Sequence, residues 1–269
     1  MTRSAAGAAV SATSAGSWLR PEALCEGVRV LFTPRTGGLS SGPFATLNLS
    51  SRVGDDPRSV SSNRERVLAA LGPGPRGLAW LHQVHGNGVV HIPGAEACEV
   101  GAAGVASPEA DAAFTGSTDV ALGVLAADCA PVLVADPVAG LVGAAHGGRP
   151  GMAAGVVPAL VDAMTRAGAD PGRMNAIIGP SICGRCYEVP AAMRDEVAAQ
   201  VPGSACQTSK GTPGIDLRAG LHGQLAALGV ERVSHDARCT AECSELYSYR
   251  RDGYTGRFAG LIWRAMMTR

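Results

Sequence analysis

Three nearly continuous apolar segments follow one another in the middle of the chain, and they limit its fold more than any other feature. They cover residues 120–126, 132–135 and 141–145, and the turn-forming stretches ADCAP and DPVAG separate them. A strand that is apolar at almost every position is covered on both faces, whereas a strand with one wet face alternates apolar and polar residues. The segments therefore predict strands that are buried between other layers of the protein.

Helix and strand signals flank these segments without strict alternation. An acidic cap followed by proline at Asp55-Asp56-Pro57 predicts a helix start, and Gly72-Pro73 predicts its end. Further helices are expected over about 151–167 (with Pro158 inside or breaking it), 190–200 and 217–228, the last capped by Asp216. Strands are expected over 28–33, on either side of a bend at 86–88, and over 175–179. The predicted fold class is α+β, or mixed α/β: a single-domain mixed β-sheet sandwich flanked by helices.

Composition and charge exclude several classes of protein. The chain of 269 residues has 23 Lys plus Arg and 23 Asp plus Glu, and this zero balance argues against nonspecific nucleic-acid binding. The longest apolar run ends at Asp128, far short of the roughly 18–20 residues of a membrane helix. Residues 1–18 are predicted to be a disordered tail rather than a signal peptide, and residues 19–269 a single catalytic domain. We expect the eight cysteines to be free thiols in a reducing cytoplasm.

Two histidines and one cysteine stand at the ends of predicted strands, beside glycine or proline turns: His85, Cys129 and His146. Strand ends can bring together side chains from different strands. Two imidazoles and a thiolate suit zinc, as three protein ligands with a fourth position open for water or substrate. The residues alone also allow a packing cysteine with two hydrogen-bonded structural histidines. They do not decide between His82 and His85, which would face opposite sides of a strand.

Four further cysteines form two close pairs, Cys183 with Cys186 and Cys239 with Cys243. Together they could make a four-cysteine zinc site. Packing of cysteines near a surface loop is the favoured interpretation. A thioredoxin-like redox site is less favoured still, because the flanking segments do not read as the opening of a βαβ unit.

A glycine-rich turn, Gly147-Gly148-Arg149-Pro150-Gly151, follows His146. A turn between a strand and a helix can present backbone amides to an anion, and Arg149 could add positive charge. A plain tight turn explains the pattern equally well. Arg35 and Asn48 are further candidates for substrate contact, although an ordinary loop position is the default interpretation for both.

Seven sequence blocks in a fixed order resemble the YfiH-like laccase-domain family, whose members are also described as purine nucleoside phosphorylases and as peptidoglycan editing factors. The blocks are TPRTGGLSSGPFATLNLS, HQVHG, ADAAFTG, ADCAPVLVADP, AAHGGRPG, GPSICGRCYEV and ELYSYRRDGYTGR. The resemblance extends from about Phe32 to Trp263. Each block alone is weak evidence, but seven in the right order are highly specific.

The resemblance implies a mixed α/β sandwich with a metal-centred pocket. Carried over by motif, the zinc ligands and catalytic residues are His85, Cys129 and His146, which selects His85 over His82. The implied activity is phosphate-dependent cleavage of the N-glycosidic bond of adenosine, inosine, guanosine or methylthioadenosine, with adenosine deamination as a second activity. The chain departs from the common AHAGWRG block, because Arg149 and Pro150 stand where Trp and Arg are usual. Its Cys183–Cys186 spacing also differs from the adjacent cysteines common in the family.

Copper and thiol chemistry are the alternatives to zinc. A multicopper oxidase needs about ten histidines, many in His-x-His pairs, whereas this chain has six and no such pair. We therefore predict zinc, with copper only as an adventitious occupant and Met152 as the only local axial ligand for it. A peptidoglycan-precursor hydrolase with Cys129 as nucleophile and Asp128 orienting its base, or a non-catalytic binding module, is the alternative function. The expected partners are a purine nucleoside and phosphate, without nucleic acid or membrane, and the expected state is a monomer.

Overall fold

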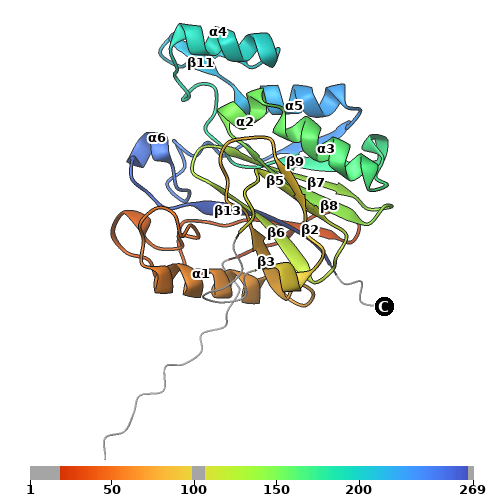
Figure 1. Ribbon diagram of the computed structural model, residues 1–269. Coiled ribbons are helices and arrows are strands. Elements are labelled where there is room, and N and C mark those ends of the chain that lie inside the picture. The colour runs from red at the N-terminus through yellow and green to blue at the C-terminus, as the bar shows by residue number, and fades with distance from the viewer. Residues whose placement is uncertain (1–18, 99–106, 266–269) are drawn as a thin grey trace, which may run out of the picture.

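The computed structural model describes residues 19–98 and 107–265, which form two facing β-sheets with helices on both outer sides (Figure 1). This arrangement confirms the mixed β-sheet sandwich that the sequence predicts. The tail predicted over residues 1–18 lies outside the described residues. Within the described part of the chain, no helix combines the length and the apolar character that a membrane crossing requires.

Six strands form one sheet, in the order β12-β9-β7-β8-β5-β4, and five form the other, in the order β1-β2-β13-β6-β3. The strands of the first are β4 (Val89–His91), β5 (Ala112–Thr115), β7 (Ala130–Asp136), β8 (Leu141–Gly147), β9 (Asn175–Ile178) and β12 (Arg232–His235). Those of the second are β1 (Glu22–Cys25), β2 (Val28–Phe32), β3 (Gly77–Trp80), β6 (Val120–Ala126) and β13 (Phe258–Arg264). A separate ribbon pairs β10 (Ala205–Gln207) with β11 (Pro213–Ile215).

The three apolar segments of the sequence form β6, β7 and β8, which are buried at nearly every position. β7 and β8 pair antiparallel in the six-stranded sheet, whereas β6 belongs to the five-stranded sheet. The sheets share one apolar layer, in which Leu122 and Ile262 of the smaller sheet pack with Leu133 of the larger. The chain therefore crosses from one sheet to the other between β6 and β7, and this short crossing contains Asp128 and Cys129.

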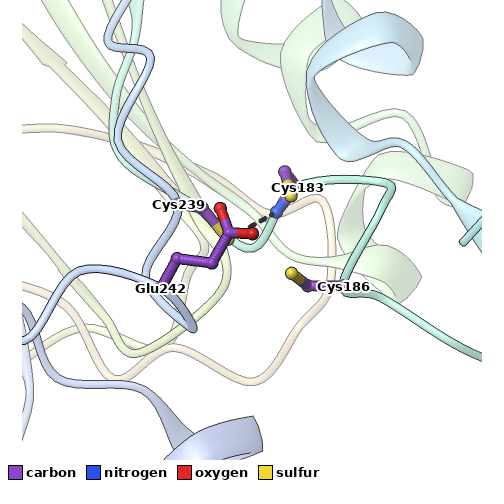
Figure 2. A group of neighbouring side chains, drawn as sticks. All are labelled: Cys183, Cys186, Cys239 and Glu242. Atoms are coloured by element: carbon purple, nitrogen blue, oxygen red, sulfur yellow. Dashed lines mark hydrogen bonds between the residues drawn. The ribbon is translucent and has the colours of Figure 1, made fainter. Parts of the chain in front are cut away.

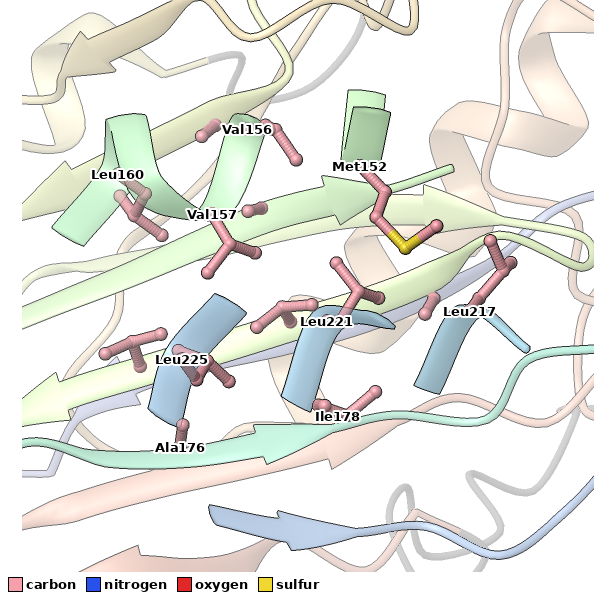
Figure 3. Close-up of a cluster of buried hydrophobic side chains, with 14 of the residues drawn as sticks. Met152, Val156, Val157, Leu160, Ala176, Ile178, Leu217, Leu221 and Leu225 are labelled. Carbon is pink, nitrogen blue, oxygen red and sulfur yellow. The ribbon is translucent and has the colours of Figure 1, made fainter. Parts of the chain in front are cut away.

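Helices cover the outer face of each sheet. On one side, α1 (Pro57–Ala70) packs Val67 against Trp80 of the five-stranded sheet. On the other side, α2 (Arg149–Ala153), α3 (Val156–Arg166) and α5 (Leu217–Ala227) cover the six-stranded sheet, and their apolar side chains meet those of β9 (Figure 3). Asp56 caps α1 and Asp216 caps α5 through hydrogen bonds from backbone amides of the first turn, as the sequence predicts. The remaining helices are α4 (Ala191–Gln200) and α6 (Tyr249–Asp252).

The single helix predicted over about 151–167 is wrong, because this segment forms two helices, α2 and α3. The chain breaks at Gly155, whose φ of 80° lies in the left-handed region that glycine enters without a steric penalty. Pro158 then falls in the first turn of α3, where its missing amide hydrogen interrupts no helical hydrogen bond. The break lets α2 start directly after β8, beside His146.

The segment that contains His82 and His85 is a loop and not a strand. β3 ends at Trp80 in the five-stranded sheet, and β4 begins at Val89 in the six-stranded sheet. The expectation that the two histidines face opposite sides of one strand is therefore wrong. The loop crosses between the sheets, as does the segment with Cys129. The two crossings bring His85 and Cys129 close together.

Candidate metal centre

His85, Cys129 and His146 come together from the two crossings and from the end of β8. Each offers one donor atom, and the three donor atoms lie within 4.8 Å of one another. The Cys129 Sγ atom lies 3.8 Å from Nε2 of His85. The rings of His85 and His146 meet edge to face, with their centroids 4.7 Å apart. The residues that the resemblance implies as ligands are thus assembled into one group.

One buried carboxylate, Asp111, holds both histidines in place. It accepts hydrogen bonds from the backbone amides of Val84 at 3.1 Å, His85 at 2.9 Å and Gly86 at 2.7 Å. These bonds hold a loop in which His85 has a φ of 62°, an uncommon conformation for a residue other than glycine. Asp111 Oδ1 also lies 2.8 Å from Nδ1 of His146, which leaves Nε2 of that ring for a metal ion. Sequence reasoning did not assign this role to Asp111.

The neighbouring histidines make the Cys129 thiol acidic. Burial raises the pKa of the Cys129 thiol, but His146, with a smaller contribution from His85, outweighs burial and lowers this pKa to about 6. Burial lowers the pKa of His146, but Cys129 and Asp111 outweigh it and raise this pKa to about 9. Cys129 is therefore a thiolate near neutral pH, which is the form that binds metals. Without a metal ion, this thiolate is paired with the His146 imidazolium.

The turn after His146 packs directly against the ligands. A Cβ atom at Gly148 would lie 2.9 Å from the Cys129 sulfur and 2.9 Å from Cδ2 of His85, so only glycine fits there without displacing a ligand. The Gly148 amide donates to the His146 carbonyl, and Pro150 has no amide hydrogen. The turn therefore allows the ligands to pack closely together. An anion in the cavity would be bound mainly by side chains and not by the backbone amides of this turn.

A cavity of about 550 Å³ opens beside the three ligands, within the size range of small-molecule sites. Part of its wall is apolar, with Leu81, Leu125 and Ile182. Four arginines also line it: Arg52, Arg149, Arg250 and Arg257. The combination suits a ligand that has an anionic part and a flat or apolar part. Of these arginines, the sequence predicted only Arg149.

Tyr187 also lines the cavity, where it lies beside the arginines. Its pKa is raised by burial, against the opposing effect of the nearby Arg149 charge. The guanidinium of Arg250 lies over its ring, 5.1 Å from the centroid. The aromatic ring and the Arg250 cation are thereby placed together in the cavity wall.

Asp128 does not orient a histidine. Its carboxylate accepts hydrogen bonds from the hydroxyls of Thr240 at 2.6 Å and Ser248 at 2.7 Å, and from the Arg250 amide at 2.7 Å. These bonds hold Asp128 at a φ of 107° and so fix the crossing that carries Cys129. The sequence-based assignment of Asp128 as the orienting acid is therefore wrong, and Asp111 occupies that position instead.

Arg35, Asn48 and Gly147 do not line the cavity. Arg35 forms an ion pair with Asp252 at 3.3 Å, and Gly147 is buried within β8. Asn48 is fully buried, and its Oδ1 accepts a hydrogen bond from the Arg257 amide at 2.9 Å. Asn48 therefore helps to hold the backbone of Arg257, which lines the cavity. None of the three residues is placed to contact a ligand in the cavity.

The donor set fits zinc better than a blue-copper site. Two imidazole nitrogens and one thiolate, with the cavity on the remaining side, match a zinc site that keeps one position open. Met152, the only local candidate for an axial copper ligand, is fully buried in the core. Its sulfur packs against Gly220 of α5, and Figure 3 shows its side chain in the apolar cluster with Leu217 and Leu221.

Comparison with known proteins places these features in a family. The family model described as "Multi-copper polyphenol oxidoreductase laccase" matches residues 29–265. Purine nucleoside phosphorylase ORF3 of Streptomyces griseus is 52% identical over 232 residues, which cover 86% of this chain and 92% of the relative. Purine nucleoside phosphorylase SCO2081 of Streptomyces coelicolor is 49% identical over 86% of this chain and 93% of its own length. The crystal structure of YlmD from Geobacillus stearothermophilus superposes with a TM-score of 0.82 at 34% identity, covering 89% of this chain and 93% of YlmD.

Proposed function

The chain belongs to the family described as multi-copper polyphenol oxidoreductase laccase, and from its site we propose that it is a zinc-dependent purine nucleoside phosphorylase. One observation carries this proposal: the His85, Cys129 and His146 donors open on a cavity lined by arginines. The names of the relatives from the two Streptomyces species agree with it. The six histidines without a His-x-His pair do not supply the ligands of a four-copper centre.

The reaction transfers a ribosyl group from a purine to phosphate. The bond between the base nitrogen and the anomeric carbon breaks, a phosphate oxygen bonds to that carbon, and the base leaves with the electron pair and a proton. Zinc bound at the centre supplies Lewis-acid polarisation of an oxygen atom of phosphate or water. The substrates that we propose are adenosine, inosine, guanosine and methylthioadenosine.

The chain's own residues bind and orient the two substrates. Arg149, Arg250 and Arg257 offer guanidinium groups for phosphate oxygens, which such groups bind through paired hydrogen bonds. The apolar wall and the ring of Tyr187 offer a surface for a flat purine. Fixed cations inside a partly closed cavity stabilise developing negative charge more strongly than water does.

Two further properties belong to the same proposal. Adenosine deamination is proposed as a second activity, because zinc-activated water next to a purine is the arrangement that deamination requires. We also propose a cytoplasmic monomer, since all eight cysteines are free thiols, as expected in a reducing compartment.

A cysteine hydrolase is the second candidate, and one observation favours it. Cys129, His146 and Asp111 follow one another in space as nucleophile, base and orienting carboxylate would: the Cys129 sulfur lies within 4.8 Å of a His146 ring nitrogen, and His146 Nδ1 lies 2.8 Å from Asp111. In that case Cys129 attacks a wall precursor directly and the centre works without metal. The two candidates differ in the reactivity of Cys129, because a thiolate bound to zinc is protected from alkylation.

Incubation with inosine and phosphate tests the proposed function. The expected products are hypoxanthine and ribose 1-phosphate, formed in equal amounts, with activity lost on chelation and restored by zinc. The variants His85→Ala, Cys129→Ala and His146→Ala should lose this activity. His222→Ala, which changes an exposed histidine on α5, is the matched control and should keep it. Full activity in the three ligand variants, or rapid alkylation of Cys129 with zinc present, would rule out the proposed mechanism.

A further inference from the structure

A second group of donor atoms lies in two loops (Figure 2), and none of its members lines the cavity beside His85, Cys129 and His146. Cys183 and Cys186 come from the loop that follows β9, and Cys239 and Glu242 come from the loop that follows β12. The three sulfurs and one carboxylate oxygen lie within 4.8 Å of one another. The sequence suggested Cys243 as the fourth member of such a group, but the structure places Glu242 there instead.

We propose that Cys183, Cys186, Cys239 and Glu242 bind one zinc ion as a closed structural site. Four donors of this kind complete the tetrahedral coordination that zinc prefers, with sulfur at about 2.3 Å and carboxylate oxygen at about 2.0–2.2 Å. Sulfurs around one tetrahedral zinc ion lie slightly under 4 Å apart by simple geometry, so the observed group needs only small side-chain movements to close around an ion.

Backbone hydrogen bonds prepare the sulfurs as ligands. The Cys183 amide donates to the Cys239 sulfur at 3.3 Å, the bond that is drawn dashed in Figure 2. Each loop makes a tight turn after its first cysteine: the Cys186 amide donates to the Cys183 carbonyl, and the Cys243 amide donates to the Cys239 carbonyl. These bonds fix the backbone that carries the sulfurs, so the donor atoms are held close together before an ion binds.

The charge of the bound group can be balanced locally. Three thiolates and a carboxylate carry four negative charges once they bind a metal ion, and a zinc ion with two positive charges leaves two. Arg185, whose guanidinium lies 3.3 Å from Glu242, partly offsets the remainder.

A disulfide explains the group less well. One disulfide uses two of the three sulfurs and gives no role to the third or to Glu242. All three cysteines are free thiols in this structure. Cys239 is buried and Glu242 is exposed, so an ion can enter from the carboxylate side.

The two loops that this site joins also hold the crossing that carries Cys129. The Ile182 amide donates to the Asp128 carbonyl at 2.9 Å, and the Thr240 hydroxyl donates to the Asp128 carboxylate at 2.6 Å. The Thr240 amide also donates to the Ser181 carbonyl at 3.2 Å. A zinc ion between the loops thus fixes the supports of Asp128, and through Asp128 the position of Cys129.

Metal analysis after purification in zinc-supplemented buffer tests this proposal independently of the proposed function. Wild-type protein should contain about two zinc ions per chain. Cys129→Ala should keep about one, because only the cavity site is lost. Adding Cys239→Ser to Cys129→Ala should remove that remaining ion. The matched controls add Cys206→Ser or Cys243→Ser, which change nearby cysteines outside the group, and should keep it.

A spectroscopic measurement keeps the test valid if Cys239→Ser does not fold. Cobalt in place of zinc in Cys129→Ala should show intense sulfur-to-cobalt charge-transfer absorption and the visible bands of tetrahedral coordination. Glu242→Gln should weaken metal binding and alter those bands while the protein stays folded. Absence of metal from Cys129→Ala, or a mass loss of two hydrogens that marks a disulfide among these cysteines, would overturn the proposal.

Discussion

The two donor groups of this protein differ in number, in origin and in what lies beside them. The cavity group has three donors, from two sheet crossings and a strand end, and its remaining side faces a cavity of about 550 Å³. The loop group has four donors from two neighbouring loops. Zinc sites with three protein ligands are typical of catalysis, and closed four-ligand sites are typical of structural roles. On our proposal, the cavity group with two imidazoles and one thiolate serves catalysis, and the loop group with three thiolates and one carboxylate serves structure.

The supports of the two groups differ as well. Asp111 is completely buried and holds both cavity histidines through four hydrogen bonds. Glu242 and Arg185 in the loop group are exposed, so water screens their ion pair. A rigid, buried support suits a centre that must hold its ligands at a fixed geometry while one position stays open. Each prediction below tests one side of this contrast.

The largest effect is expected from Gly148→Ala. The new methyl group meets the Cys129 sulfur and the His85 ring at 2.9 Å, so at least one ligand must move. We expect loss of zinc from the cavity group and loss of phosphorolysis, while the loop group keeps its zinc. Gly223→Ala, at an exposed position of α5, is the control and should raise stability by up to about 1 kcal/mol. Normal zinc content and activity in Gly148→Ala would show that the ligands tolerate displacement.

The next effect is the pH dependence of metal binding. His146, with a pKa raised to about 9, must lose its proton to bind metal, whereas Cys129, with a pKa lowered to about 6, has already lost its own. Cavity-group affinity should therefore rise about tenfold per pH unit between about pH 6 and pH 9. Metal titrations of Cys239→Ser, which retains only the cavity group, measure this slope.

The loop group should show a steeper dependence over the same range. The pKa values of both Cys186 and Cys239 are raised, so metal binding displaces at least the protons of these two thiols. Titration of Cys129→Ala measures this slope. The structure indicates that the two groups release different numbers of protons on metal binding. Equal slopes in the two variants would contradict this difference.

A smaller effect is expected from Asp111→Asn. The substitution keeps the shape of the side chain but weakens its hold on His146 and on the His85 loop, and such changes typically reduce metal affinity by about 10- to 100-fold. Arg185→Gln is the matched change in the loop group and should reduce affinity there much less, because its ion pair is exposed. Competition with a zinc-binding dye measures both affinities. A larger loss of zinc affinity in Arg185→Gln than in Asp111→Asn would contradict the view that the buried support matters more than the exposed ion pair.

Much of the fold could be predicted from local patterns. The apolar segments gave β6, β7 and β8, and the caps at Asp56 and Asp216 marked two helices. The assignment of β6 to a different sheet from β7 could not be predicted. It depends on the pairing of β6 with β13, which follows it by more than 130 residues in the sequence. The break between α2 and α3 at Gly155 could not be predicted either, because the apolar pattern of the sequence continues across it.

The candidate ligands could be predicted, but their support could not. His85, Cys129 and His146 stand beside Gly or Pro turns, which local sequence reveals, but only the resemblance to the family selected His85 over His82. Asp111 acts through backbone amides about 25 residues earlier in the chain and through a side chain 35 residues later, and no local pattern records such contacts. Its one sequence signal is an acidic residue directly before a buried strand.

Zinc anomalous diffraction from crystals grown with zinc tests the central claim most directly. The account predicts a peak within about 2.0–2.3 Å of the Cys129 sulfur and of one ring nitrogen each from His85 and His146. It also predicts that the fourth coordination position faces the cavity and holds no protein atom. Absence of a peak at this place, or a fourth protein ligand that closes it, would contradict the account.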